Sequence, residues 1–397
     1  MLTINFGAEG NSADFVAGGW SVSERRLRWM TGTESELRIE PGLIGGDHIM
    51  ELDLHPFARP PKVPSQRLTV AVNGTLIGGS TIANGGRFGY RIPAAVLADR
   101  ASTSIKFTHP DAARPCDSGP SNDRRLLSLS IMRMRISPVR QGASQRFLVG
   151  KVGIGLKDLG QAVGMDPARF ILNFESLGNN CEFGLVQRIC GAEAFLSLLR
   201  FAGMELPTLL RALDAGMQDF GDAAHVEIRV DDKERPEFVV HETHYGVFFH
   251  TFRYADETQA DRLHASESKR LAYCARRFIG DLQKGSKILV VKRNEPLQEH
   301  EILPLYAALS AYGPNVLLWV VPADARHTPG SVETVLPGLL RGYIGRFAPY
   351  ENAPDLLLDE WLEVCVNAYR LAREDAMGAS RDVGALGRRA DTLAQTL

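Results

Sequence analysis

The chain of 397 residues is long enough for two or three domains with hydrophobic cores. Hydrophobic residues make up 44% of it and charged residues 23%, which is the balance of a globular protein and excludes a disordered or fibrous one. The formal net charge of −2 lacks the strongly basic balance that would favour nucleic acid as a partner.

The start of the chain and its cysteines indicate a compartment. Residues 1–7 contain no basic segment followed by a long apolar run, so we expect no secretory signal, and no stretch predicts a membrane span. The five cysteines are an odd number without metal-site spacing, so we expect reduced thiols and a cytoplasmic location. Neither a Walker loop nor a convincing dinucleotide fingerprint is present, and we expect no cofactor.

Residues 1–138 alternate short β-type runs with turn residues, which predicts an antiparallel β-sandwich of the jelly-roll kind. Asn73-Gly74 lies between two such runs and predicts a hairpin, because both turn residues can adopt positive φ. Strands are predicted at 36–39, 48–54, 68–72, 75–77, 88–92, 104–108 and 126–136. Residues 139–167 are Gly-rich and weakly patterned, which predicts a linker.

From 168 to 372 the pattern changes to longer helices mixed with apolar strands, which predicts an α/β domain with a mixed or partly parallel sheet. Strands at 287–293 and 315–321 with a helix at 298–312 between them predict a βαβ unit. Further strands are predicted at 170–177, 225–230, 237–241 and 246–250, and helices at 181–190, 193–202, 206–214, 258–283 and 357–372. The Ala-, Gly- and Arg-rich tail, 373–397, is expected to be a loose helix or disordered.

The most informative segment is 170–184, where a predicted strand runs through Gly178, Asn179 and Asn180 into Cys181 at the start of a predicted helix. Backbone N–H groups and the positive end of a helix favour an anionic sulfur and can bind an oxyanion. Cys181 is therefore a candidate nucleophile, and the three residues before it form a candidate oxyanion site. A free cysteine is also an ordinary packing residue, so a structural role stays open.

A cysteine nucleophile needs a base and a group that orients the base. His250 ends a short apolar strand and is the candidate base. Asn294, Glu295 and Asp324 follow two predicted strands of the βαβ unit, and α/β proteins assemble sites at the carboxyl ends of parallel strands. Each of the three is a candidate to orient the base, and each also suits a turn or a helix cap.

Two metal interpretations are weaker. His241 and His244 are three residues apart, whereas the zinc metalloprotease motif places its histidines four apart on a helix. The loop 115–124 carries oxygen ligands suited to calcium, but it is also typical of a turn-rich connection. We therefore predict no metal site.

Three segments carry a family resemblance. Ser176-Leu-Gly-Asn-Asn-Cys-Glu182 resembles the Ser-Leu-Gly-x-x-Cys signature of a bacterial family of papain-like cysteine peptidases of unknown function, and Gly246-Val-Phe-Phe-His-Thr-Phe252 resembles its later strand. Arg276-Arg277-Phe278, followed by 287–293, resembles the helix and strand that come next in that family. The resemblance covers about residues 170–370 and implies Cys181 as nucleophile and His250 as base, with no third member fixed. The turn before Cys181 is also similar to the Gly-Asn-Cys-Gln turn of capsule-polysaccharide acetyltransferases, with one more residue before the cysteine.

The first half resembles, more loosely, sugar-binding β-sandwiches found beside bacterial glycosyltransferases and polysaccharide enzymes, through Gly18-Gly-Trp-Ser21, Glu24, Trp29 and Val72-Asn-Gly74. This resemblance implies Trp20 and Trp29 as carbohydrate-binding residues, although a Trp in a small sandwich is often a core residue. The leading hypothesis is a thiol-dependent hydrolase or acyltransferase whose sandwich recruits a polysaccharide or another partner. The alternative is a non-catalytic carbohydrate-binding protein, and the sequence does not indicate an oligomeric state.

Overall fold

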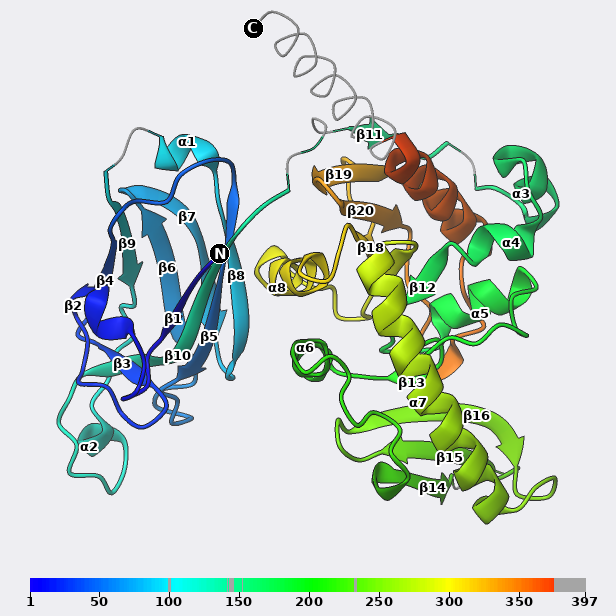
Figure 1. The fold of residues 1–397 in the computed structure, drawn as a ribbon, viewed down its shortest axis with the longest axis horizontal. Helices are drawn as coiled ribbons and strands as arrows, with labels where there is room; N and C mark the ends of the chain where they lie inside the picture. Colours follow the sequence, from blue (N-terminus) through cyan, green and yellow to red (C-terminus); the bar gives the residue numbers. More distant parts are fainter. Residues whose placement is uncertain (99–100, 141, 143–145, 152, 232–233, 375–397) are drawn as a thin grey trace, which may run out of the picture. The chain divides into compact units, whose positions relative to one another are not determined.

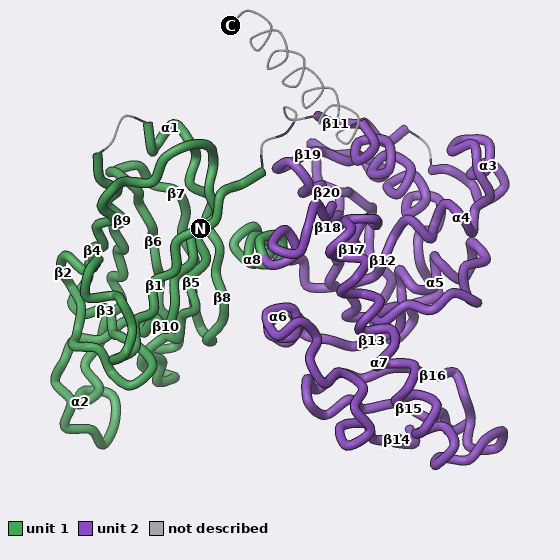
Figure 2. Tube along the Cα trace, viewed as in Figure 1, with its two compact units in different colours: residues 1–141, 298–307 green, residues 142–297, 308–397 purple. Residues whose placement is uncertain are grey.

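The structure is a computed structural model that describes residues 1–98, 101–140, 142, 146–151, 153–231 and 234–374 (Figure 1). Its internal contacts divide the chain into two compact units (Figure 2). Unit 1 is Met1–Gln141 with Gln298–Ala307, and unit 2 is Gly142–Leu297 with Ala308–Leu397. Among the described residues, no helix is both long enough and apolar enough to cross a membrane. The predicted tail lies outside the described residues from 375 onward.

Unit 1 is a β-sandwich. Its strands are β1 (Leu2–Asn5), β2 (Val16–Gly18), β3 (Arg28–Thr31), β4 (Glu34–Ile39), β5 (His48–Pro56), β6 (Gln66–Val72), β7 (Thr75–Ile82), β8 (Gly86–Ile92), β9 (Thr103–Thr108) and β10 (Leu127–Pro138). One antiparallel sheet has the order β1-β10-β5-β8, with β3 also on β10, and the other has the order β2-β4-β9-β6-β7. Side chains from both sheets form one buried core, which includes Leu52 of β5 and Phe107 of β9.

The hairpin predicted at Asn73-Gly74 is confirmed. Asn73 and Gly74 have φ of 48° and 82°, and β6 pairs antiparallel with β7 on either side of them. Along β6 the side chains alternate between buried and more exposed positions, because successive residues of a strand point to opposite faces of the sheet. The local pattern of apolar residues therefore set which face of this sheet entered the core.

The main sheet of unit 2 has six strands in the order β11-β19-β20-β18-β17-β12. Their bounds are β11 (Phe147–Leu148), β12 (Phe174–Ser176), β17 (Ile288–Val291), β18 (Val316–Pro322), β19 (Val332–Leu336) and β20 (Leu339–Ile344). Strands β12, β17, β18 and β20 are parallel, whereas β19 and β11 are antiparallel additions. The predicted mixed sheet is confirmed, and α8 (Glu299–Ser310) connects β17 to β18 as the predicted βαβ unit requires.

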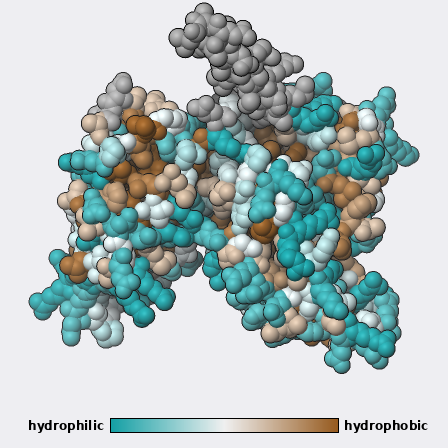
Figure 3. All heavy atoms as spheres, viewed as in Figure 1, coloured by the Kyte–Doolittle hydropathy of each residue, from teal (hydrophilic) through white to brown (hydrophobic). Residues whose placement is uncertain are grey.

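A second, antiparallel sheet of unit 2 has the order β13-β16-β15-β14. It consists of β13 (Ala202–Gly203), β14 (Val226–Val230), β15 (Glu237–Glu242) and β16 (Val247–Tyr254). The helices of the chain include α1 (Ala94–Leu97), α2 (Pro115–Ser118), α3 (Leu156–Val163), α4 (Pro167–Ile171), α5 (Glu182–Ile189), α6 (Leu206–Asp214) and α7 (Ala260–Lys284). A last helix begins at 358 and continues to 374. On the face drawn in Figure 3, hydrophobic residues form small patches among hydrophilic ones.

The structure differs from the prediction around the start of unit 2. The segment predicted as a linker contains β11 and α3, and the predicted strand 170–177 begins only at Phe174 because α4 occupies the residues before it. The side chain of Asp166 accepts hydrogen bonds from the N–H groups of Ala168 and Arg169, and Pro167 starts the helix. An Asp followed by Pro is a helix-start signal that outweighed the apolar run after it.

One further prediction was wrong and one element was missed. Residues 193–201 form turns and irregular structure instead of a helix, Ala202 already belongs to β13, and the hairpin of β19 and β20 was not predicted. Buried Arg200 binds Gln187 and the carbonyl of Ala192, so tertiary contacts override the helical pattern there. The missing hairpin had a local signal, since Pro337-Gly338 separates its two strands and Gly338 has φ of 84°.

Candidate functional site

Cys181 lies at the N-terminal end of α5, directly after the turn that follows β12. Gly178 and Asn179 have φ of 84° and 89°, so two consecutive left-handed residues reverse the chain before the helix. The N–H group of Gly178 donates to Ser176 Oγ at 3.2 Å, and Asn180 Oδ1 accepts from the N–H group of Glu182 at 3.1 Å. The predicted strand, tight turn and helix are therefore present, and the Cys181 side chain is partly exposed.

Lys292, the residue after β17, brings a buried ammonium group to this turn. Its Nζ donates to Glu182 Oε2 at 2.5 Å and to Asn294 Oδ1 at 2.8 Å. Burial lowers the pKa of Lys292, while the negative charges of Glu182 and of the Cys181 thiolate act to raise it. Because this attraction is mutual, the ammonium of Lys292 favours the thiolate form of Cys181.

Asn294 joins the Cys181 turn to the rest of the sheet edge. Its Oδ1 accepts from Asn180 Nδ2 at 2.8 Å, and its Nδ2 donates to the carbonyl of Ala348 at 3.1 Å. The parallel strands β12, β17 and β20 end at the same edge, so residues that follow three separate strands meet there. The structure thus places Asn294 beside the Cys181 turn, as expected from its position after a strand.

Trp361 completes a cluster whose other members are Cys181, Glu182, Lys292 and Asn294, and we call these five residues the thiol network. Its Nε1 donates to Glu182 Oε1 at 2.8 Å, so both oxygens of this fully buried carboxylate have a donor. A hollow of about 460 Å³ opens at the same edge and is lined by Asn294, Pro322, Gly345–Pro349 and Asp355. The sheet edge therefore combines a buried ion pair, a cysteine and an adjacent cavity.

His250 lies elsewhere in unit 2, on β16 of the second sheet. Its Nδ1 is 3.3 Å from Glu237 Oε2, and it lines a second cavity of about 470 Å³ with Arg188 and Arg200. Cys181 is not among the residues that line this cavity. Arg188, which does line it, lies seven residues after Cys181, a separation of about 10 Å along a helix axis. Cys181 and His250 therefore do not share a described cavity, and a Cys–His pair stays a prediction.

Asp324 follows β18 but belongs to a local turn. Its Oδ1 accepts from the N–H groups of Arg326 and His327 and lies 2.8 Å from His327 Nδ1. These backbone hydrogen bonds and His327 lower the pKa of Asp324. The carboxylate therefore holds its own turn, as the turn interpretation predicted.

The histidines considered for zinc have other neighbours. His241 stacks on Phe248 with ring centres 4.2 Å apart, and its Nδ1 is 3.7 Å from Glu227. His241 lies on strand β15 rather than on a helix. In the described part of the chain, no group of three or more His, Cys, Asp or Glu side chains could hold a metal ion.

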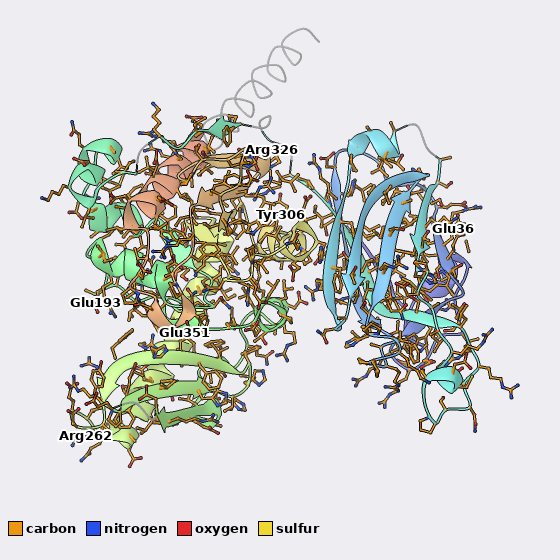
Figure 4. The ribbon with its side chains drawn as sticks, turned by 180° about the vertical axis from the view of Figure 1, so that it is seen from behind. Glu36, Glu193, Arg262, Tyr306, Arg326 and Glu351 are labelled. Carbon is orange, nitrogen blue, oxygen red and sulfur yellow. The ribbon has the colours of Figure 1, made fainter. Side chains whose placement is uncertain are left out.

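The structure separates the two tryptophans proposed for carbohydrate binding. Trp20 packs against the core of unit 1, 5.3 Å from the Phe6 ring, and its Nε1 donates to the carbonyl of Glu36, which is labelled in Figure 4. Trp29 instead lies next to Met30 on β3, and Met30 is fully buried in the core. Because neighbouring strand residues face opposite ways, Trp29 lies on the outer face, partly exposed and 6.5 Å from the Phe57 ring.

No family model and no curated protein sequence matches this chain. Among solved structures, the chain is similar to a CBM36 domain of a xylanase from the hindgut metagenome of Trinervitermes trinervoides, with 10% identity and a TM-score of 0.23 over 35% of this chain and 98% of that one. It is also similar to the CBM6 domain of a laminarinase from Zobellia galactanivorans, with 13% identity and a TM-score of 0.21 over 34% of this chain and 98% of that one. TM-scores this low do not establish a shared fold or a shared ligand.

Sequence reasoning missed Lys292 and its partners Glu182 and Trp361. A signal for Lys292 was present, because it is a charged residue directly after four buried apolar residues of a parallel strand. Such a position faces the carboxyl edge of the sheet, where sites form. Trp361 had no comparable signal, since it lies 179 residues from Glu182 in the chain.

Proposed function

We propose that the protein binds glycans through unit 1, with Trp29 as the residue on which a sugar ring stacks. The observation that carries this proposal is the position of Trp29, partly exposed on the outer face of the sandwich and outside its core. The C–H face of a sugar ring packs on an aromatic face, and a Trp held by its strand loses little entropy on binding. Phe57 supports the indole edge-to-face, and the Arg59 guanidinium lies 5.9 Å from the Phe57 ring centre, where it could reach sugar hydroxyls.

Affinity electrophoresis of the full chain in native gels that contain xylan or laminarin tests this proposal. We expect one of these or a related polysaccharide to retard the wild type, and Trp29→Ala to weaken binding about tenfold, as expected for the loss of roughly 1.4 kcal/mol of stacking. Tyr350→Ala is the matched control, because this side chain is 63% exposed and lies in unit 2. Equal retardation of both variants, or none of the wild type across a panel of glycans, would reject the proposal.

A second candidate function is thiol-dependent acyl hydrolysis or transfer by unit 2, which the thiol network favours. In this mechanism the Cys181 thiolate, stabilised by Lys292 and the N-terminal end of α5, attacks an acyl carbonyl. Backbone N–H groups around Asn180 and Cys181 stabilise the oxyanion, whose collapse breaks the bond to the alcohol or amine of the donor, and this group leaves with a proton from water. Water or an acceptor hydroxyl then attacks the thioester, loses its proton to solvent and takes the acyl group, which restores the Cys181 thiolate. The resemblance to papain-like peptidases instead requires His250 as the base, so the two versions make different predictions.

The pH dependence of iodoacetamide labelling of Cys181 separates these versions. We expect selective labelling near pH 6 in the wild type and in His250→Ala, and a shift to higher pH when Lys292→Met is combined with Glu182→Gln. The double variant removes both buried charges, so neither remains without a partner. Lys284→Met, at the exposed end of α7, is the control.

If labelling is lost in His250→Ala instead, the papain-like pair is correct and the role of Lys292 is wrong. A Cys181 that reacts no faster than Cys190, Cys274 and Cys365 would reject thiol chemistry altogether. Burial raises the pKa of Cys190 to about 12 and raises the pKa of Cys274 and Cys365 as well, so these three thiols should react slowly.

A further inference from the structure

We propose that unit 2 binds a small organic phosphate in the cavity of about 470 Å³ that is lined by α5, residues 193–201, β16 and α7. We call this cavity the arginine pocket. The arginine pocket lies entirely within unit 2. None of its lining residues takes part in the glycan proposal, and among them only His250 takes part in a version of the thiol proposal. The inference therefore stands or fails independently of the proposed function.

The charge balance of the arginine pocket favours an anion. Its lining includes four arginines and two glutamates: Arg188, Arg200, Arg253, Arg270, Glu193 and Glu267. Glu193, labelled in Figure 4, is 3.0 Å from Arg188 Nε, and Glu267 is 2.6 Å from Arg270 Nε. In the described part of the chain neither Arg200 nor Arg253 forms an ion pair, so the lining has two more positive than negative charges. The carboxylate of Glu237, behind His250 and Phe252, reduces this excess to one.

Arg200 is the central residue of the arginine pocket, because it lines the cavity although it is only 5% exposed. Its Nε donates to Gln187 Oε1 and its Nη1 to the carbonyl of Ala192, both at 3.0 Å. A guanidinium has five N–H donors, so Arg200 keeps donors that its neutral partners do not use. Burial lowers the pKa of Arg200, and the charges of Glu175 and Glu193 offset this only in part, without a direct ion pair. An anion that binds the guanidinium directly would reduce the remaining cost of burying the charge.

Aromatic contacts and a buried carboxylate fix the side chains that surround Arg200 in the arginine pocket. The Arg188 guanidinium lies over the Phe201 and Phe252 rings, 4.8 Å and 4.3 Å from their centres. Phe252 has φ of 53°, a strained value for an aromatic residue, and its N–H group donates to Glu237 Oε1 at 2.9 Å. The other oxygen of Glu237 orients His250, so one buried carboxylate fixes two parts of the cavity wall.

The size and lining of the arginine pocket indicate an ester rather than free phosphate. Guanidinium forks match the oxygens of a phosphate group with paired hydrogen bonds. The volume of about 470 Å³ is within the roughly 300–1,000 Å³ usual for small-molecule sites and exceeds the needs of one inorganic ion. Phe195, which is 48% exposed, adds apolar surface on which the organic part of the ligand can pack.

Isothermal titration of the full chain with UDP, glucose 1-phosphate, inorganic phosphate and citrate tests the inference. We expect UDP or glucose 1-phosphate to bind at least tenfold more tightly than inorganic phosphate, and citrate not to bind. Arg200→Lys keeps the charge but loses the fork, and Arg253→Gln loses an unpaired charge, so each should weaken binding about tenfold or more. Arg229→Gln, on exposed β14 where Arg229 pairs with Glu227, should leave the affinity unchanged.

Three results would overturn the inference: no phosphate ester binds at millimolar concentration, citrate binds as tightly as the esters, or Arg229→Gln weakens binding as much as Arg253→Gln. If Arg200→Lys does not fold, Arg253→Gln and Arg270→Gln decide the matter, because both residues are less buried than Arg200. A preference for UDP over glucose 1-phosphate would identify a nucleotide as the ligand, and the reverse a sugar phosphate.

Discussion

At the scale of single residues, His109 links the stability of unit 1 to pH. The side chain is fully buried, and its Nε2 is 2.9 Å from Ser35 Oγ. Ser35 donates its only hydroxyl hydrogen to the carbonyl of Gly19 at 2.6 Å, so His109 Nε2 must carry the proton and donate to Ser35. Burial lowers the pKa of His109 to about 4. The effect of burial outweighs the Gly32 carbonyl and the charge of Glu34, which both act to raise this pKa.

We expect this histidine to reduce the free energy of unfolding as the pH falls. Between pH 6.5 and 4 the unfolded chain binds a proton that the folded chain does not, so stability is complete above the ordinary value of 6.5 and is lost as the pH falls toward 4. The loss between pH 7 and pH 5 should be about 2 kcal/mol. Urea unfolding at the two pH values measures it, and an NMR titration in which His109 protonates near pH 6.5 would contradict it.

The buried ion pair of the thiol network should be sensitive to the loss of one partner. Glu182→Gln leaves the ammonium of Lys292 buried without a counter-charge, and we expect it to lower the free energy of unfolding by about 3–5 kcal/mol. Glu205→Gln is the matched control, because Glu205 pairs with the adjacent Arg293 but is 78% exposed, and it should change stability by less than about 1 kcal/mol. Equal effects of both variants in chemical denaturation would show that burial of the Lys292 pair does not matter.

At the scale of secondary structure, Gly184 sets how closely α5 approaches residues 200 and 201. A Cβ at this position would lie 2.5 Å from the carbonyl oxygen of Arg200 and 2.6 Å from a Phe201 ring carbon. A glycine inside a helix is otherwise unfavourable, so its presence here is explained by packing. This close approach also keeps Arg200 beside Gln187, which lies one turn further along α5.

We expect Gly184→Ala to destabilise unit 2 by about 1–3 kcal/mol even though alanine is the better helix former, because neither backbone can easily move. Gly280→Ala in α7 is the control, since a Cβ there meets nothing within 4 Å, and this change should stabilise by about 0.5–1 kcal/mol. Thermal and urea unfolding compare the two. A neutral or stabilising Gly184→Ala would mean that α5 can shift away from residues 200 and 201.

At the scale of the whole molecule, the two units have separate hydrophobic cores. Leu52 belongs to the core of unit 1 and Leu318 to that of unit 2, and both are fully buried. Leu52→Ala and Leu318→Ala should each remove about 2–5 kcal/mol from the core they belong to. In calorimetry of the full chain we therefore expect two transitions, of which each variant lowers a different one. A single transition lowered equally by both variants would show that the cores unfold together.

The sequence by itself determined the elements whose signals are local. Alternation of apolar residues and the Asn73-Gly74 turn specified the strands of the sandwich, and two apolar strands around a helix specified the parallel pair β17 and β18. The strand-to-helix turn at Cys181 was also visible, because its glycine and asparagine residues suit left-handed conformations. Such features depend on neighbouring residues, which the sequence lists in order.

Only the tertiary structure decided which side chains meet. It placed Lys292 and Trp361 against Glu182 across 110 and 179 residues of chain, and it packed Trp20 against the core while leaving Trp29 on the outer face. It also placed His250 in the lining of the arginine pocket, which does not include Cys181. These outcomes depend on strand order and on the packing of distant segments, for which periodicity and turn chemistry carry no information.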